Sequence, residues 1–282
     1  MTKRTAALLT LPLALMCGFR DPSGRPTRSS TPVAHRKIAL IVEENHPYGT
    51  IVGSKQAPYI NGTLIRHGAL LTRYYAITHP SLPNYLALDS GSTQGCTSDV
   101  CGSYRARDLG GQLTRARKSW AGYMESMPGP CVRTTVRLYA AKHNPFVHFT
   151  DVLKNRCASH VVPMPRKMPT SLHRFTWITP NLLDDMHDGT IQRGDTWLKD
   201  HVPAIMRGLG PNGLLIVTWD EGSSSQRASH VATILYGPIV RKGIRVSAKT
   251  NHYSLLRLME SRLRLAHLAK ARRATRIRGW HT

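Results

Sequence analysis

Three short runs with apolar interiors restrict this chain to a narrow class of folds. They are Lys37–Glu43 (KIALIVE), Arg174–Pro180 (RFTWITP) and Gly213–Trp219 (GLLIVTW). Strands buried on both faces have this composition, and such strands occur in parallel sheets that helices cover. A fourth run, His230–Tyr236, is a further predicted strand. Because helical segments alternate with the strands, we predict an α/β fold: a doubly wound, mostly parallel sheet with helices on both faces.

The other predicted elements are shorter or less regular. Two further strands and three helices are expected, in this order: strands Ala69–Ile77 and Trp120–Met124, then helices Leu109–Lys118, Asp195–Met206 and Tyr253–Leu265.

Polar side chains follow the apolar runs at the ends where α/β enzymes place their chemistry. Glu43-Glu44-Asn45-His46 follows the first run, and Asp220-Glu221 follows the third. Carboxylate and amide oxygens at such an edge suit a hard divalent cation. An ordinary polar loop is the alternative for Glu43–His46 taken by itself.

A denser polar cluster follows the second run. Asn181 is succeeded by Asp184, Asp185, His187 and Asp188. A histidine among three carboxylates is held in its charged form more easily than a free one, which suits a general acid. A metal-free, salt-bridged loop is the alternative.

The stretch Ile77–Ser92 (ITHPSLPNYLALDSGS) is predicted to deliver a hydroxyl to the start of a helix. Ser81 is the expected N-cap, and the helix is expected to end near Ser90-Gly91. A helix start offers free N–H groups and a partial positive charge, which suit phosphate. For an isolated Ser-x-Pro, capping alone would be the better explanation. His79 and the polar clusters favour a reactive Ser81 instead.

The chain is predicted to divide into four parts. Residues 1–17 have the basic start and short apolar run of a signal peptide, too short to span a bilayer as a stable helix. Residues 18–36 form a flexible linker, residues 37–260 the catalytic domain and residues 261–282 a basic, solvated tail. We therefore expect a secreted or cell-envelope protein. Lipoprotein anchoring at Cys17 is a minority alternative, because Met16 is too large for the usual cleavage site.

Export fits the cysteines, since four remain once Cys17 is set aside. We expect Cys96 to pair with Cys101, and Cys131 with Cys157. A zinc site is the alternative, but the spacing contains no CxxC pair.

The formal net charge of +23, from 39 Lys and Arg against 16 Asp and Glu, favours anionic partners. We expect a phosphate-ester substrate and peripheral attraction to anionic cell-wall or membrane surfaces. The sequence shows no specific nucleic-acid motif and gives no oligomeric state.

Nine separate blocks of the chain, between Lys37 and Glu260, resemble the phosphoesterase family that contains bacterial acid phosphatases and phospholipases C. In order they are VEENHPYGTI, NGTL, YYAITHPSLPNYLALDSGS, KSWAGYMESMP, KHNPFVHFTDV, FTWITPNLLDDMHDGTIQRGDTWL, IVTWDEG, HVATILYGP and NHYSLLRLME. The resemblance implies an alkaline-phosphatase-like fold, hydrolysis of phosphate esters and a divalent metal ion of unknown identity. The chain departs from the family at Leu183, Gly189 and Ser229, and its basic tail does not match.

The resemblance also implies a set of site residues. Glu44, Asn45, Asp220 and Glu221 are the expected metal ligands. Ser81 is the expected nucleophile, with Thr78 as the alternative. His143 and His187 match family histidines near the phosphate, and one of the two is expected to protonate the leaving oxygen. From their positions in the sequence, His79 is a further catalytic candidate, and Asn84 and Asn144 are the candidate phosphate-binding amides. His230 and His252 lie in matched blocks without an assigned role.

We therefore predict a secreted, metal-assisted phosphomonoesterase of the acid phosphatase type. Two alternatives stay open: a phosphodiesterase of the phospholipase C type, and an inactive protein that binds polyanions through its excess positive charge.

Overall fold

The central strands of the fold are the three apolar runs. The computed structural model describes residues 36–222 and 229–281. Its strands are β1 (Ile38–Glu43), β2 (Ala69–Leu71), β3 (Tyr74–Tyr75), β4 (Trp120–Met124), β5 (Val161–Pro163), β6 (Phe175–Thr179), β7 (Leu214–Trp219), β8 (Thr233–Tyr236), β9 (Ile244–Val246) and β10 (Thr250–Asn251). The main sheet has eight of them in the order β5-β4-β6-β1-β7-β8-β2-β9. Strands β6, β1 and β7 are buried along their whole length.

These central strands run parallel, and Ile38 is aligned with both Phe175 and Leu214. Their carboxyl ends therefore meet at one edge of the sheet. Strands β4 and β5 continue the parallel arrangement, whereas β8 is antiparallel to both of its neighbours. The predicted doubly wound, mostly parallel α/β fold is confirmed.

The strand predicted over Ala69–Ile77 is wrong in its extent. Only β2 belongs to the main sheet, and β3 pairs with β10 in a separate two-stranded sheet. After β2 the chain leaves the main sheet and pairs with the segment before α7, where the carbonyl of Arg73 accepts a hydrogen bond from Thr250 N–H at 3.0 Å.

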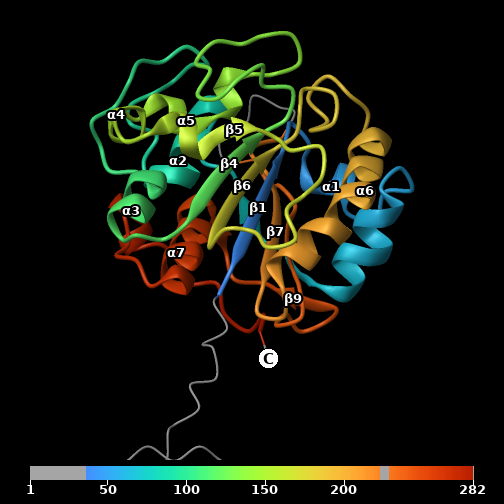
Figure 1. Cartoon of the computed structure of the whole chain (residues 1–282). Helices are drawn as coiled ribbons and strands as arrows, with labels where there is room; N and C mark the ends of the chain where they lie inside the picture. Colours follow the sequence, from blue (N-terminus) through green and yellow to red (C-terminus); the bar gives the residue numbers. More distant parts are fainter. Residues whose placement is uncertain (1–35, 223–228, 282) are drawn as a thin grey trace, which may run out of the picture. The chain divides into compact units, whose positions relative to one another are not determined.

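Helices cover both faces of the main sheet, as Figure 1 shows: α2 (Ser81–Ser90), α3 (Leu109–Arg115) and α7 (His252–Leu263) lie on one face, and α1 (Tyr48–Ile51) and α6 (Ile191–Leu209) on the other. The shorter helices are α4 (Thr150–Lys154), α5 (Cys157–His160), the π-helical η1 (Ile60–Ile65) and the 3-10 segments η2 (Ala141–His143), η3 (Pro145–His148) and η4 (Ala269–Arg272). Helix α6 begins earlier than predicted because the Thr190 hydroxyl accepts a hydrogen bond from Arg193 N–H and caps it.

Both expected disulfides are present, Cys96–Cys101 and Cys131–Cys157. No helix among residues 36–222 and 229–281 is long and apolar enough to cross a membrane. The predicted signal peptide and nearly all of the predicted linker lie outside the described residues, and the domain boundaries stay predictions.

The C-terminal residues pack on the domain, so the expectation of a solvated tail is wrong. Leu268, Ala271, Ile277 and Trp280 are buried. Trp280 also accepts a backbone hydrogen bond from Arg241 N–H at 2.9 Å. The reason is that apolar residues are spaced between the basic ones and give this segment a buried side.

Glu260 on α7 holds this C-terminal segment and should make stability depend on pH. Its Oε1 accepts a hydrogen bond from Leu268 N–H at 2.8 Å, while burial raises its pKa to about 8. The folded state keeps the Glu260 proton at pH values where the unfolded chain has already lost it. The resulting stabilisation is fully present below the pKa of Glu260 in the unfolded chain, and it is lost as the pH rises through the pKa in the folded state. Between about pH 6 and about pH 9 the loss should be on the order of 2 kcal/mol.

Glu260→Gln cannot titrate, so its free energy of unfolding should fall less over this interval than that of the wild type. Urea denaturation at both pH values measures the difference. Asp200→Asn, which changes an exposed carboxylate on α6, is the matched control and should behave as wild type. Equal pH dependence in Glu260→Gln and wild type would contradict the assignment.

Candidate active site

The expected metal ligands of β1 and β7 meet at the carboxyl edge of the sheet. Asp220 N–H donates to the carbonyl of Glu43 at 3.0 Å, and Asn45 N–H donates to Asp220 Oδ1 at 3.2 Å. Asn45 has a φ of 54°, a left-handed conformation that asparagine tolerates better than most residues. This turn brings the two predicted pairs, Glu44-Asn45 and Asp220-Glu221, into direct contact.

Helix α2 places the Ser81 hydroxyl against this edge. Ser81 Oγ donates to Glu44 Oε2 at 3.0 Å, and Tyr85 one turn later donates to Glu44 Oε1 at 2.6 Å. Ser81 is therefore not the N-cap that we predicted; it is the first helical residue, and Pro80 precedes it without a side-chain cap. Its hydroxyl is free of a capping role because it is bonded to Glu44.

The helix ends where we predicted, at Gly91, which has a φ of 74°. A Cβ at this position would lie 2.8 Å from the carbonyl oxygen of Leu268, so the close approach of the C-terminal segment also requires glycine.

The loop before Ser81 is held by the side chain of Asn84. Its Oδ1 accepts the N–H groups of Ile77 and Thr78, and its Nδ2 donates to Thr78 O and, at 3.0 Å, to Glu221 Oε2. The Thr78 hydroxyl donates to the neighbouring carbonyl of His79 at 3.2 Å. Asn84 therefore joins the loop to Glu221, while Thr78 is bonded within the loop.

The three expected histidines lie around this centre in different environments. His79 Nδ1 lies 2.9 Å from Glu221 Oε2, with about a fifth of its side chain exposed. His143 is buried between Glu44 Oε1 at 3.3 Å and Asp185 Oδ2 at 3.2 Å, and its ring stacks on Tyr85. Burial lowers the pKa of His143 well below its usual range, and Lys142 and His187 lower it further. His143 is therefore a neutral ring.

The His187 side chain is 22% exposed, against 2% for that of His143. Of the carboxylates of Asp184, Asp185 and Asp188, its ring bonds that of Asp188. Nδ1 lies 2.7 Å from Asp188 Oδ1, and Nε2 lies 3.1 Å from Lys142 Nζ. Asp185 accepts from the His187 backbone N–H instead, and Asp184 pairs with Arg193.

The Asn144 side chain bonds a residue outside this group, and its buried Oδ1 has no hydrogen-bond partner among the described residues. Its Nδ2 donates to the Tyr139 hydroxyl at 2.9 Å, and its side chain is fully buried.

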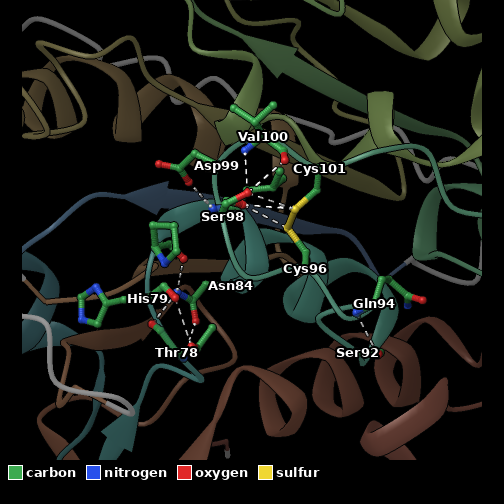
Figure 2. Close-up of a disulfide and its surroundings, with 12 residues drawn as sticks. Thr78, His79, Asn84, Ser92, Gln94, Cys96, Ser98, Asp99, Val100 and Cys101 are labelled. Atoms are coloured by element: carbon green, nitrogen blue, oxygen red, sulfur yellow. Dashed lines mark hydrogen bonds between the residues drawn. A yellow bond between two sulfur atoms is a disulfide. The ribbon is translucent and has the colours of Figure 1, made fainter.

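Two charged residues that we did not predict complete the surroundings of Ser81. Lys142 Nζ lies 3.1 Å from Asp99 Oδ2, and Asp99 Oδ1 accepts the N–H of Leu82, the residue after Ser81. Figure 2 shows Asp99 on the loop that the Cys96–Cys101 disulfide closes, beside the start of α2. The position of Asp99 inside the predicted disulfide loop, and that of Lys142 in the KHNPF block, are the signals that could have indicated them.

Burial and mutual repulsion dominate the electrostatics of the carboxylates. Burial raises the pKa of Glu44 well above its usual range, and the charges of Asp220 and Asp185 raise it further. Burial likewise raises the pKa of Asp220 to about 7 and that of Glu221 to about 9. Such a group is destabilised when ionised unless a cation neutralises it.

A divalent cation fits this group of side chains. Asp220 Oδ2 is buried and has no hydrogen-bond partner among the described residues, and the neighbouring donors are mainly oxygen atoms. One ligand atom each from Glu44, His143 and His187 also lies within 4.8 Å of the others. Oxygen-rich sites suit hard cations, and the histidines extend the choice to transition metals.

Of the two histidines without an assigned role, His252 contacts the site directly. His252 Nε2 lies 2.6 Å from the carbonyl oxygen of Asp220, and its Nδ1 lies 2.8 Å from the Tyr74 hydroxyl. Burial lowers the pKa of His252 to about 4, so the ring is neutral and positions Asp220. The ring of His230 stacks with those of Tyr48 and Tyr75.

Comparison with known proteins gives consistent matches. The model of the phosphoesterase family matches residues 54–266. A phosphatidylinositol-3-phosphatase of Mycobacterium tuberculosis is 37% identical over 79% of this chain and 75% of its own length. A probable acid phosphatase of Kluyveromyces lactis is 28% identical over 84% of this chain and 60% of its own length.

Solved structures share the fold at much lower identity. A protein of the alkaline phosphatase superfamily from Vibrio parahaemolyticus aligns with a TM-score of 0.58 and 10% identity, over 83% of this chain and 67% of its own. Murine ectonucleotide pyrophosphatase/phosphodiesterase 5 aligns with a TM-score of 0.57 and 11% identity, over 83% of this chain and 96% of its own. The fold is therefore that of the alkaline phosphatase superfamily.

We expect a divalent cation to stabilise the protein through the Asp220 group. Calcium, magnesium, manganese and zinc are each added to metal-free protein, and Tm is measured at pH 8 and pH 5. A cation at about a hundred times its Kd should contribute about 2.7 kcal/mol, which raises Tm by roughly 5–10 °C. The shift should be smaller at the lower pH because the cation must displace protons.

Asp220→Asn should remove this shift, while raising the Tm of the metal-free protein at pH 8 because one buried charge is gone. Asp188→Asn, which changes an exposed carboxylate nearby, should keep the shift. If no cation raises Tm, or if Asp220→Asn responds as the wild type does, the metal assignment is wrong.

Proposed function

The chain belongs to the phosphoesterase family and is a phosphoric ester hydrolase; on this premise, we propose that it is a secreted, metal-assisted phosphomonoesterase in which Ser81 is the nucleophile. The observation that carries the proposal is the hydrogen bond from Ser81 Oγ to Glu44, at the start of a helix and at the edge where Glu44 and Asp220 meet.

The geometry supports Ser81 over Thr78. Ser81 contacts the carboxylate group directly, whereas the Thr78 hydroxyl bonds the carbonyl of the next residue. Both lie in one loop, but only Ser81 stands at the first position of α2.

We assign the binding of the phosphate oxygens to Lys142 and to the Leu82 N–H. Both donors bond Asp99 in this structure, and a phosphate dianion offers them more negative oxygen atoms than a carboxylate does. Asn84, which we expected to bind phosphate, is engaged by the loop and Glu221; we assign it to positioning the loop. A phosphate contact of Asn144 stays a prediction.

Glu44, Asn45, Asp220 and Glu221 are the residues that would hold the cation. When bound there, a divalent cation lowers the pKa of a nearby hydroxyl and neutralises charge on the phosphate.

The reaction then follows from the residues around Ser81. Ser81 Oγ loses its proton to a water molecule and attacks phosphorus, while Glu44, which would hold the cation and so stays ionised, orients the hydroxyl through its hydrogen bond. Once Lys142 binds the phosphate, its ammonium no longer faces His187 Nε2, and a protonated His187 can donate to the leaving oxygen as the ester P–O bond breaks. His143, which is buried and neutral, suits this role less well. Water then attacks the phosphoserine and releases phosphate. His79, which is paired with Glu221 two residues before Ser81, is our candidate for proton transfer in this second half.

The relatives favour phosphomonoesters over diesters as substrates, since the matched curated proteins are phosphatases by name. Secretion is supported by the two disulfides, which persist in oxidising compartments. The polyanion-binding alternative has only the net charge of +23 in its favour.

Replacement of the nucleophile gives the first test. Ser81→Ala should lower kcat on p-nitrophenyl phosphate by at least about a thousandfold, because the covalent step disappears. Thr78→Ala is the matched control and should keep kcat within about tenfold of wild type. Comparable losses in the two variants, or a large loss only in Thr78→Ala, would refute the assignment of Ser81.

Replacement of Lys142 tests how the phosphate is bound. Lys142→Gln should raise KM for p-nitrophenyl phosphate by about 10- to 100-fold, because one charged hydrogen bond to the phosphate is lost. Lys154→Gln changes an exposed lysine outside the site and should leave KM unchanged. An unchanged KM in Lys142→Gln would show that Lys142 does not contact the substrate.

A further inference from the structure

A basic cavity lies beside the loop that leads to Ser81. It measures about 660 Å³, within the usual range of small-molecule sites. Its walls come from β3, from β10 and the start of α7, and from the C-terminal segment, with Lys249, Lys270 and Arg273 as its charged residues. None of the described residues lining it carries a carboxylate. The cavity is therefore a site of net positive charge.

The three cations are not used in ion pairs within the described part of the chain. Lys249 Nζ lies 5.4 Å from the centre of the Tyr75 ring, and Lys270 Nζ lies 5.3 Å from that of Tyr253. Each lysine thus rests on an aromatic face, an interaction that is weak at an exposed site. Such lysines remain available to an anionic ligand.

Two buried hydroxyl groups among the lining residues have no partner. Tyr253 is 7% exposed and Thr250 3% exposed, and neither hydroxyl has a hydrogen-bond partner among the described residues. Burial raises the pKa of Tyr253, so its hydroxyl keeps its proton and can donate. Buried polar groups in folded proteins are nearly always hydrogen-bonded, so these two residues of the cavity wall carry hydroxyl groups whose hydrogen bonds are not satisfied among the described residues.

The C-terminal wall is held in place. Arg257 Nη1 donates to the carbonyls of Arg272 and Ala274 at 2.8 Å each, and Lys270 N–H donates to the carbonyl of Gly91 at 3.1 Å. The cations of this wall therefore have fixed backbone positions, which reduces the entropy that a ligand must overcome on binding.

Two segments of the chain connect the cavity to the proposed catalytic site. Ala76, one of its lining residues, precedes Ser81 by five residues, which span at most about 18 Å. Asn251, on the opposite strand, precedes His252, whose ring contacts the Asp220 carbonyl. A ligand of modest length can therefore occupy both places.

We propose that this cavity is a second phosphate site, which binds a distal phosphate of the substrate while another phosphate is hydrolysed at Ser81. The natural substrates would then carry at least two phosphate groups. The binding of phosphate in the cavity stands on its own contacts, whereas its use by the substrate rests on the proposed function.

The first experiment measures binding alone. Inorganic phosphate is titrated into the full chain by calorimetry, for wild type and for Lys249→Gln/Lys270→Gln/Arg273→Gln. The triple variant should lose one of two phosphate sites and keep its turnover of p-nitrophenyl phosphate. Arg241→Gln/Lys242→Gln/Lys199→Gln removes the same charge from exposed positions outside the cavity and should retain both sites.

Tyr253→Phe provides a second variant that keeps the packing of the ring. It should weaken the cavity site several-fold because only the donor is removed. If both cavity variants bind phosphate as the control does, the proposal is overturned, whatever the turnover shows. Absence of turnover in wild type would instead overturn the proposed function and leave this binding result valid.

The second experiment identifies the source of the phosphate. The value of kcat/KM is measured for alkanediol bisphosphates of increasing chain length and for the matched alkyl monophosphates. Wild type should prefer one length of bisphosphate by about tenfold or more, and the triple variant should lose that preference. Loss of the calorimetric site without any bisphosphate preference would identify free phosphate as the ligand and overturn the substrate role.

Discussion

The burial of four neighbouring carboxylates at the edge of the sheet is the constraint on which the site depends. Glu44, Asp185, Asp220 and Glu221 are nearly or fully buried, and burial raises the pKa of each. The charge of Asp220 raises the pKa values of the other three further. Hydrogen bonds satisfy only part of this group, because Asp220 Oδ2 has no hydrogen-bond partner among the described residues. A structure that keeps such a group must compensate its charge, and a divalent cation does so most directly.

Helix α2 is the element that fixes the carboxylates in place. Ser81, Asn84 and Tyr85 are spaced i, i+3 and i+4, so their side chains leave one face of the helix. Ser81 and Tyr85 each bond one oxygen of Glu44, after β1, and Asn84 bonds Glu221, after β7. One helical face therefore determines the relative positions of ligands from two strands. The same face presents the hydroxyl that we propose as the nucleophile.

The apolar runs predicted the central strands because short, continuous apolar runs of this length are typical of strands buried on both faces. The meeting of Glu44-Asn45 with Asp220-Glu221 also followed from parallel strands that end at one edge. Other contacts depend on tertiary packing that no local pattern encodes. Asp99 reaches the start of α2 only through its disulfide loop, and the C-terminal segment is buried because Gly91 admits its backbone.

The most direct test of the central claim is to trap the covalent intermediate. The full chain is mixed with a phosphomonoester, quenched in acid within one turnover, digested and analysed by mass spectrometry. Phosphoserine is stable in acid, and our account predicts a phosphoryl group on Ser81 at an early time point. Phosphate on Thr78 instead, or an active enzyme with no phosphorylated peptide at any time within the turnover, would contradict it.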